Sequence, residues 1–248
     1  MPYLGEKSHI LLNVTDLKNS LHFYQKLGFK TLDKREHNDN WALLTDQAIF
    51  LMLYEDEVSS AALTYFAPDI ENKISALQQQ EVAIDHIYTD DEGQSVIQAV
   101  MRDPNQLPVN LVKFNPSGLP DIDLNQDTRC GIFGEFVVHT GDLEESLDFW
   151  KKLNHQVLQH SSTPYPHALI SDGTIIIGLH QNNNEEHKKA LLTYFAPDMH
   201  NRLNGLRLEN VSIKEEQKNE KGVTIQAAAE APDGERIYLF KGSLESSG

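Results

Sequence analysis

The chain has 248 residues, of which 40% are hydrophobic, and its 21 Lys and Arg against 37 Asp and Glu give a net charge of −16. This length predicts one large or two small domains with a buried core. No stretch approaches the ~18 consecutive apolar residues of a membrane span, and residues 1–14 lack the pattern of a signal peptide, so a cytoplasmic protein without membrane contact is expected.

The charge and the cysteine content restrict the classes of ligand and partner that the chain is expected to bind. The Lys and Arg residues are scattered among acids, which argues against nucleic-acid binding and favours neutral or cationic ligands. Cys130 is the one cysteine, so it forms no internal disulfide and no thiolate metal site by itself. The presence of a single cysteine agrees with a protein of a reducing compartment.

Internal repetition is the strongest signal in the chain. Asp-Leu-Lys-Asn-Ser-Leu-His-Phe-Tyr-Gln-Lys-Leu at 16–27 is mirrored by Asp-Leu-Glu-Glu-Ser-Leu-Asp-Phe-Trp-Lys-Lys-Leu at 142–153, and Thr-Tyr-Phe-Ala-Pro-Asp occurs at both 64–69 and 193–198. The stretch after residue 115 is rich in Pro, Gly, Asn and Asp, as linkers are. We therefore predict domains at 1–116 and 130–242, a linker at 117–129 and a disordered or added tail at 243–248.

In the first half, residues 10–14 predict a buried strand, and Asp16 caps a helix that ends at Gly28. The apolar face of this helix is Leu17, Leu21, Tyr24 and Leu27. A second helix is predicted at 69–80. Further strands are predicted at 29–34, 41–44, 48–54, 63–66, 84–88, 95–101 and 109–114.

The second half follows the same order, with helices predicted at 143–153 and 199–208. Its strands are predicted at 136–139, 168–170, 174–179, 192–195, 223–228 and 236–240. The order strand, helix, strand, strand, strand recurs along the chain. The fold class is therefore predicted to be α+β, built from four βαβββ units.

These units carry a resemblance to a known family. The first opens with His9-x6-Asp16-Leu-x2-Ser-Leu-x-Phe-Tyr-x2-Leu-Gly28, and the hairpins Asp103-Pro-Asn-Gln and Ala231-Pro-Asp-Gly precede the last strand of each half. This pattern resembles the vicinal oxygen chelate superfamily of glyoxalase I, bleomycin-resistance proteins and extradiol dioxygenases. The resemblance implies two half-open barrels of mixed sheet, each around a cavity in which three or four inward side chains hold one divalent metal.

The ligand positions implied by the resemblance are mostly non-ligating here. The first ligand falls on His9 and, in the second half, on Glu135. The later positions fall on Leu51, Ala62 and Asn110 in the first half and on Ile177, Leu191 and Tyr238 in the second. Whichever units pair, at most two polar groups remain, whereas a catalytic zinc takes three protein ligands. We therefore expect no metal and no other cofactor, with His9 or Glu135 as the ligand if a metal binds.

Substitute ligands are not evident from the pattern. His139 shares a strand face with Glu135, but four residues at ~3.3 Å each separate them by about 13 Å, too far for one metal. The residues expected to line the cavity or bind a ligand are His9, Asn13, Phe66, Asn110, Glu135, His139, Phe195, Arg236 and Tyr238.

Two of these residues have competing interpretations. Glu135 is a candidate general base or an anchor for a cationic ligand; alternatively it is a structural carboxylate bonded to Tyr238. His9 is either functional or a core histidine bonded to Asn110. Arg236 either neutralises Glu135, grips an anionic substrate or lies in solvent at the barrel mouth.

Three functions follow. The leading hypothesis is a small-molecule-binding protein with a degenerate metal site that sequesters a hydrophobic or cationic toxic compound. The alternative is a lyase, isomerase or ring-cleaving dioxygenase that uses a divalent metal with recruited ligands, or acid-base chemistry without metal. The third is a scaffold with filled cavities. The pairing of the units stays open, as does the choice between monomer and homodimer.

Overall fold

A computed structural model of the chain describes residues 4–35, 40–58, 60–182 and 189–243. The helices are α1 Leu17–Lys26, α2 Ile70–Gln79, α3 Leu143–Lys152 and α4 Met199–Leu208. The strands of the first half are β1 Lys7–Val14, β2 Lys30–Arg35, β3 Trp41–Thr45, β4 Phe50–Glu55, β5 Ser60–Phe66, β6 His86–Thr89, β7 Val96–Arg102 and β8 Pro108–Val112. A 3-10 turn, η1, spans Pro116–Gly118.

The second half repeats this series. Its strands are β9 Ile132–His139, β10 Gln156–Ser161, β11 His167–Ser171, β12 Ile176–His180, β13 Ala190–Ala196, β14 Ile213–Lys218, β15 Thr224–Glu230 and β16 Arg236–Lys241. None of the helices in the described ranges is long and apolar enough to cross a membrane. The four predicted helices are confirmed, each within one or two residues of its predicted ends.

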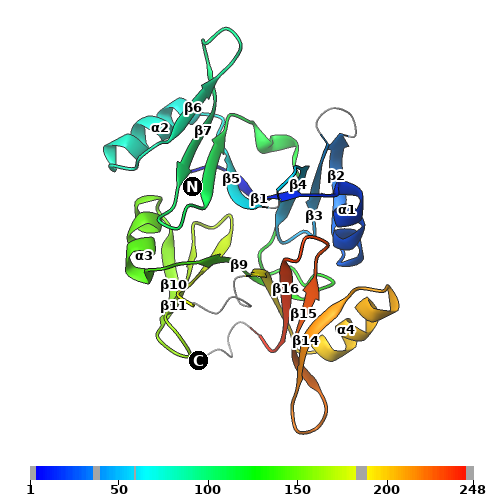
Figure 1. The fold of residues 1–248 in the computed structure, drawn as a ribbon. Coiled ribbons are helices and arrows are strands. Elements are labelled where there is room, and N and C mark those ends of the chain that lie inside the picture. The colour runs from blue at the N-terminus through cyan, green and yellow to red at the C-terminus, as the bar shows by residue number, and fades with distance from the viewer. Residues whose placement is uncertain (1–3, 36–39, 59, 183–188, 244–248) are drawn as a thin grey trace. The chain divides into compact units, whose positions relative to one another are not determined.

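Each half of the chain builds one open, eight-stranded sheet (Figure 1). The strand orders are β2-β3-β4-β1-β5-β8-β7-β6 and β10-β11-β12-β9-β13-β16-β15-β14. The pairs β5–β8 and β13–β16 are parallel and the hairpin pairs are antiparallel, so both sheets are mixed. The predicted α+β fold of four βαβββ units is confirmed, and these four units are called modules one to four in chain order. Neither sheet closes into a complete barrel.

Packing groups the modules differently from the sheets. One compact unit falls within residues 1–11, 61–120 and 138–183, and thus combines the second module with the third. The other falls within 12–60, 121–137 and 184–248, and combines the first module with the fourth. The domain boundaries at 116 and 130 stay predictions, and residues 244–248 of the predicted tail lie outside the described residues.

Two edge strands, β10 and β14, were not predicted from the sequence. Both lie at the edge of the second sheet, and most of their residues are exposed. β14 reads Ile-Lys-Glu-Glu-Gln-Lys, which has no apolar alternation. Charges on an edge strand such as β14 disfavour pairing with other chains and remove the period-two pattern by which strands are recognised. β10 is uncharged, and its apolar residues Val157 and Leu158 are adjacent and do not alternate with polar ones.

An aspartate precedes each of the four helices, and at α1 and α3 its side chain caps the helix. Asp16 accepts a hydrogen bond from the backbone N of Asn19 at 2.9 Å, and Asp142 accepts one from Glu144 N at 3.0 Å. These bonds satisfy N–H groups that have no partner inside the helix. Asp198 makes no such cap at α4; its carboxylate instead binds Arg202.

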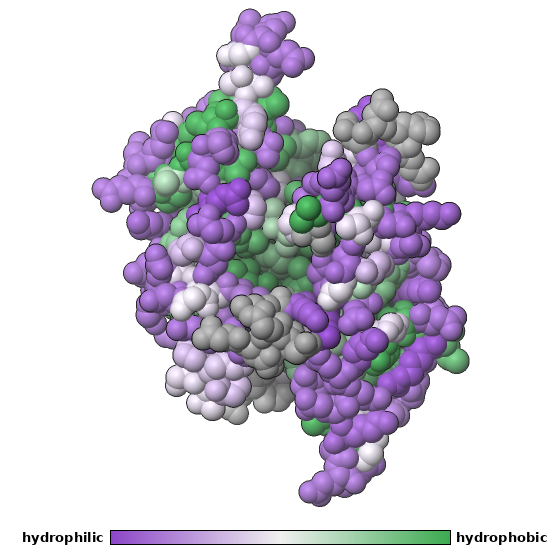
Figure 2. Space-filling view, viewed as in Figure 1, coloured by the Kyte–Doolittle hydropathy of each residue, from purple (hydrophilic) through white to green (hydrophobic). Residues whose placement is uncertain are grey.

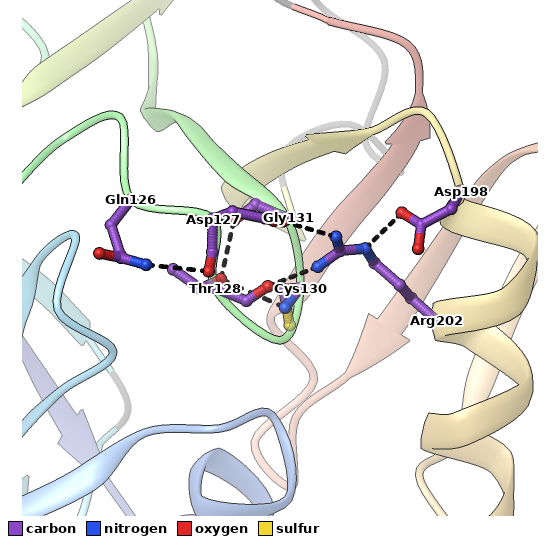
Figure 3. Close-up of polar contacts among 7 residues, drawn as sticks. All are labelled: Gln126, Asp127, Thr128, Cys130, Gly131, Asp198 and Arg202. Atoms are coloured by element: carbon purple, nitrogen blue, oxygen red, sulfur yellow. Dashed lines mark hydrogen bonds and ion pairs between the residues drawn. The ribbon is translucent and has the colours of Figure 1, made fainter.

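Arg202 also fixes the end of the predicted linker (Figure 3). Its Nη1 donates to the carbonyl of Thr128 at 2.5 Å, Nη2 lies 2.9 Å from Asp127 Oδ2, and Nε lies 2.6 Å from Asp198 Oδ1. Directly after this clamp, Cys130 is fully buried, and burial raises its thiol pKa to about 12. This cysteine is therefore a protonated core residue, not a reactive thiolate.

Candidate functional site

The two faces of the second sheet have different chemistry. α4 packs against β15 and β16, and Tyr194, Ile237 and Leu239 on this side are fully buried. Because side chains alternate along a strand, Thr193 and Tyr238, which are register partners, point to the opposite, helix-free face. Polar and aromatic residues of β9, β13 and β16 gather on that face.

Glu135 is the buried carboxylate of the helix-free face, with 8% of its surface exposed. It lies opposite Thr193, whose Oγ1 donates to Glu135 Oε1 at 3.4 Å. The register then shifts, and Phe133 pairs with Tyr194, leaving Gly134 as a bulge. Phe133 therefore lies on the opposite face from Glu135, with its ring 5.7 Å from that of Tyr194.

A row of stacked rings continues from this carboxylate along the same face. Phe195 and Phe240 stack with centroids 5.3 Å apart and planes 21° apart, and Tyr238 stacks on Phe240 at 6.0 Å and 16°. Phe195 and Phe240 are half-buried, whereas Tyr238 is buried. The row therefore presents part of its aromatic surface to solvent.

Tyr238 and Arg236 are tied to an acidic residue that sequence reasoning missed. Tyr238 donates its hydroxyl to Glu215 Oε2 at 2.5 Å, and Arg236 pairs with Glu215 and, at 3.5 Å, with Glu230. Burial, followed by Glu215, raises the pKa of Tyr238 to about 12. Arg236 is buried, so the alternative that places it in solvent at a barrel mouth is wrong.

The corresponding face of the first sheet is neutral. His9 is buried with its ring 5.0 Å from that of Phe66, which lies 4.9 Å from the ring of Phe114. Asn110 donates from Nδ2 to Thr64 Oγ1 at 3.2 Å. Burial lowers the pKa of His9 to about 3, so its imidazole is uncharged at neutral pH.

The predicted bond between His9 and Asn110 is not formed. The Nδ1 atom of His9 is buried and, among the described residues, has no hydrogen-bond partner. The amide of Asn110 serves Thr64 instead. His9 is therefore a core histidine with an unsatisfied ring nitrogen.

The remaining predicted residues lie apart from these two groups. Asn13 donates from Nδ2 to Ser60 Oγ at 3.0 Å and to Asp56 at 3.4 Å, which joins the exposed ends of β1 and β5. His139 is half-buried at the end of β9 and belongs to a different compact unit from Glu135. The structure thus brings together Glu135, Phe195, Arg236 and Tyr238 on the helix-free face of the second sheet. It brings together His9, Phe66 and Asn110 on the corresponding face of the first sheet.

The residues present do not fit the divalent metal that the resemblance implies. Leu51 and Ile177 are fully buried apolar residues. The residue opposite Glu135 is Thr193, two positions beyond the expected Leu191, and Tyr238 uses its hydroxyl on Glu215. One carboxylate with two hydroxyls is a poor donor set for zinc or iron. Within the described part of the chain, no three His, Cys, Asp or Glu side chains group together as metal ligands do.

Comparison with known proteins agrees with this architecture. Residues 8–111 match the model of the Glyoxalase/Bleomycin resistance protein/Dioxygenase superfamily. Among solved structures, the E323L mutant of homoprotocatechuate 2,3-dioxygenase from Brevibacterium fuscum is similar, with a TM-score of 0.63 and 17% identity over 98% of this chain and 72% of that one. Residues 8–111 are thus similar to this superfamily, and the second half of the chain repeats their strand order.

Two further structures extend the likeness. The homoprotocatechuate 2,3-dioxygenase of Arthrobacter globiformis has a TM-score of 0.64 and 14% identity, covering 96% of this chain and 80% of that one. A catechol 2,3-dioxygenase has a TM-score of 0.62 and 13% identity, covering 97% and 87%. At these identities the likeness establishes the fold. No curated protein matches the chain.

Proposed function

We propose that the chain is a member of this superfamily and a small-molecule-binding protein that works without a divalent metal. Its binding surface is the helix-free face formed by Glu135, Thr193, Phe195, Tyr238 and Phe240. The observation that carries the proposal is the juxtaposition of a buried carboxylate with a row of stacked, partly exposed rings. Small-molecule sites combine such an apolar lining with a few placed polar groups.

The charges of this face favour a cationic ligand group. The buried Arg236 pairs with two carboxylates, those of Glu215 and Glu230, so its positive charge is offset on this face. Stacked aromatic rings also attract cations through their negative faces. A flat apolar compound with an ammonium group therefore fits the face best, and sequestration of such a compound is the activity we propose.

A matched set of ligands tests this proposal. Calorimetry would measure the binding of naphthylmethylamine, naphthylmethanol and naphthoate, which share one ring system. The metal content of the protein would be determined beforehand. The expected order of affinity is amine, alcohol, carboxylate, and Glu135→Gln should weaken the amine about tenfold while changing the alcohol little. His9→Gln, on the other sheet, is the control and should leave all three unchanged. Equal binding of the three compounds, or an unchanged amine affinity in Glu135→Gln, would contradict the proposal.

Ring cleavage or lyase chemistry with a divalent metal is the second candidate. It is favoured by the likeness to structures named as homoprotocatechuate 2,3-dioxygenase, one of them an H200E variant in complex with HPCA. The test is elemental analysis after incubation with iron, manganese, zinc and nickel, followed by oxygen uptake with catechol. A near-stoichiometric ion with catalysed uptake would place this candidate first; we expect neither.

A further inference from the structure

The direction of two hydroxyl hydrogen bonds limits what the helix-free face can bind. Thr193 and Tyr238 are register partners on the neighbouring strands β13 and β16, and neighbouring strands lie about 4.8 Å apart. Each of the two residues is buried, with 5% of its surface exposed. Both hydroxyls therefore belong to one small area of the face, where the low dielectric of the surroundings strengthens each hydrogen bond.

A carboxylate fixes the hydrogen of each hydroxyl group, because a carboxylate accepts hydrogen bonds and has no hydrogen to donate. Thr193 Oγ1 donates to Glu135 Oε1 at 3.4 Å, and the Tyr238 hydroxyl donates to Glu215 Oε2 at 2.5 Å. With their hydrogens engaged in this way, the two hydroxyl oxygens offer lone pairs to a ligand. This part of the face therefore matches a ligand group that donates hydrogen bonds.

Glu215 reaches Tyr238 from the edge strand β14 because that strand is irregular. The register of β14 against β15 shifts at Glu215, which has a φ of 48°. A bulge of this kind changes the direction in which the side chains point. Glu215 contacts Tyr238 on the helix-free face, whereas the next residue, Glu216, pairs with Arg207 of α4 at 2.7 Å.

The strand around Glu215 is otherwise typical of a solvated edge. Figure 2 shows mainly hydrophilic residues over the β14–β15 hairpin, at the foot of the view. A positive φ is uncommon for residues other than glycine, and β14 contains no glycine. Such backbone angles persist where the surrounding structure requires them, and they are frequent in binding sites. The backbone of β14 thus supports the placement of the Glu215 carboxylate beside Tyr238.

We propose that this face selects a primary or secondary ammonium group, whose N–H bonds point to the oxygens of Thr193 and Tyr238, over a quaternary ammonium group of equal charge. The inference rests on the proposed function and narrows its ligand class. Attraction of a cation to stacked rings requires only its charge, whereas the two oxygens require hydrogens to accept. Glu215 is then a positioning residue, because it acts on the ligand through the hydroxyl of Tyr238.

The test compares naphthylmethylamine with its N,N,N-trimethyl derivative, which keeps the ring and the charge and has no N–H group. Calorimetry on the full-length protein gives both affinities, and we expect the wild type to bind the amine at least about tenfold more tightly. In Glu215→Gln, Arg236 can only donate, so it takes the amide oxygen and leaves the amide NH2 facing Tyr238. The Tyr238 hydrogen then points to the ligand, and the ratio of the two affinities should fall about fivefold or more.

Two further variants complete the test. Glu216→Gln is the matched control, because it removes the same charge from the neighbouring residue on the α4 side. It should leave the ratio of the two affinities unchanged within about twofold. Tyr238→Phe keeps the stacked ring and removes the oxygen, so it should lower the ratio as Glu215→Gln does.

The outcomes separate this inference from the proposed function. Equal affinity of the wild type for the two cations, each above that for naphthylmethanol, would overturn the inference and leave the proposed function standing. An unchanged ratio in Glu215→Gln and Tyr238→Phe would also overturn the inference alone. If neither cation binds more tightly than naphthylmethanol, the proposed function fails together with the inference.

Discussion

Asp233, in the turn between β15 and β16, holds the start of α1 through Thr15, 218 residues earlier in the chain. Its Oδ1 accepts the backbone N–H of Thr15 at 3.3 Å and also the Thr15 hydroxyl. The turn between β7 and β8 repeats this contact with an amide: Asn105 Oδ1 accepts from Gly141 N, and its Nδ2 donates to Ser146 Oγ, both at 3.0 Å. The two hairpins that carry the family resemblance thus join modules within each compact unit.

Removal of this contact should destabilise the protein measurably. Asp233→Ala leaves the N–H and hydroxyl of Thr15 without their acceptor, and we expect the free energy of unfolding to fall by about 1–2 kcal/mol. Asp233→Asn keeps an acceptor oxygen and should lose less than half as much. Urea unfolding followed by circular dichroism measures both variants. Identical midpoints for the wild type and Asp233→Ala would show that the turn contributes nothing to stability.

The bulge at Gly134 should tolerate no side chain. A Cβ placed there would lie 2.5 Å from Phe195 Cε2 and closer still to Thr193 Oγ1. We expect Gly134→Ala to reduce the free energy of unfolding by about 1–3 kcal/mol, because overpacking forces its neighbours to shift. Gly141→Ala is the matched control, since a Cβ there meets no heavy atom within 4 Å. Thermal unfolding of the two variants decides this, and equal melting temperatures would contradict the assigned bulge.

Much of the fold could be predicted because repetition reveals itself in the sequence. Two copies of Thr-Tyr-Phe-Ala-Pro-Asp and two aspartate-capped helices at one offset define four modules before any coordinate is known. In each copy the tyrosine stands between a threonine and a phenylalanine, so strand alternation puts it on the opposite face from both. Tyr65 and Tyr194 are indeed fully buried, and Thr193 lies opposite Glu135.

The candidate site could be predicted only in part, because its geometry depends on register and on an edge strand. The position implied by the resemblance is Leu191, but the register of β13 against β9 places Thr193 opposite Glu135. Glu215 lies in the charged strand β14, where no apolar alternation marks a strand. Its positive φ of 48° departs from extended geometry, which no residue pattern indicates.

A buried histidine distinguishes the two compact units and can be replaced by its counterpart. In one unit, Tyr194 donates its hydroxyl to Asp46 Oδ2 at 2.7 Å; in the other, the Tyr65 hydroxyl lies 3.1 Å from His155 Nε2. The offset of 126 residues between Asp16 and Asp142 places Phe29 at the position of His155. Phe29 belongs to the first module, which shares a compact unit with the fourth module, the one that contains Tyr194. Burial lowers the pKa of His155, an effect that Asp172 partly offsets.

His155→Phe should therefore be tolerated and should reduce acid sensitivity. At pH 7.5 we expect the free energy of unfolding to change by less than about 1–2 kcal/mol, since one hydrogen bond is exchanged for apolar contact. At pH 5 the variant should gain relative to the wild type, because the unfolded wild type takes up a proton on His155 that the folded state resists. Urea unfolding at both pH values measures this, and a variant that weakens equally at each pH would contradict the expectation.

His9 should dominate the loss of stability in mild acid. Its pKa is lowered to about 3 in the folded protein by burial, against 6.5 for an exposed histidine. Above pH 6.5 the imidazole is neutral in both states; as the pH falls from 6.5 toward 3, only the unfolded chain binds the proton, so stability falls. At 1.36 kcal/mol per pH unit the loss reaches about 2 kcal/mol at pH 5, and it levels off below pH 3. Urea unfolding between pH 7.5 and 4 should show this slope, and His9→Gln should flatten it, whereas His86→Gln, at an exposed position on β6, should not. An unchanged slope in His9→Gln would mean that His9 is accessible to solvent and protonates in the folded state.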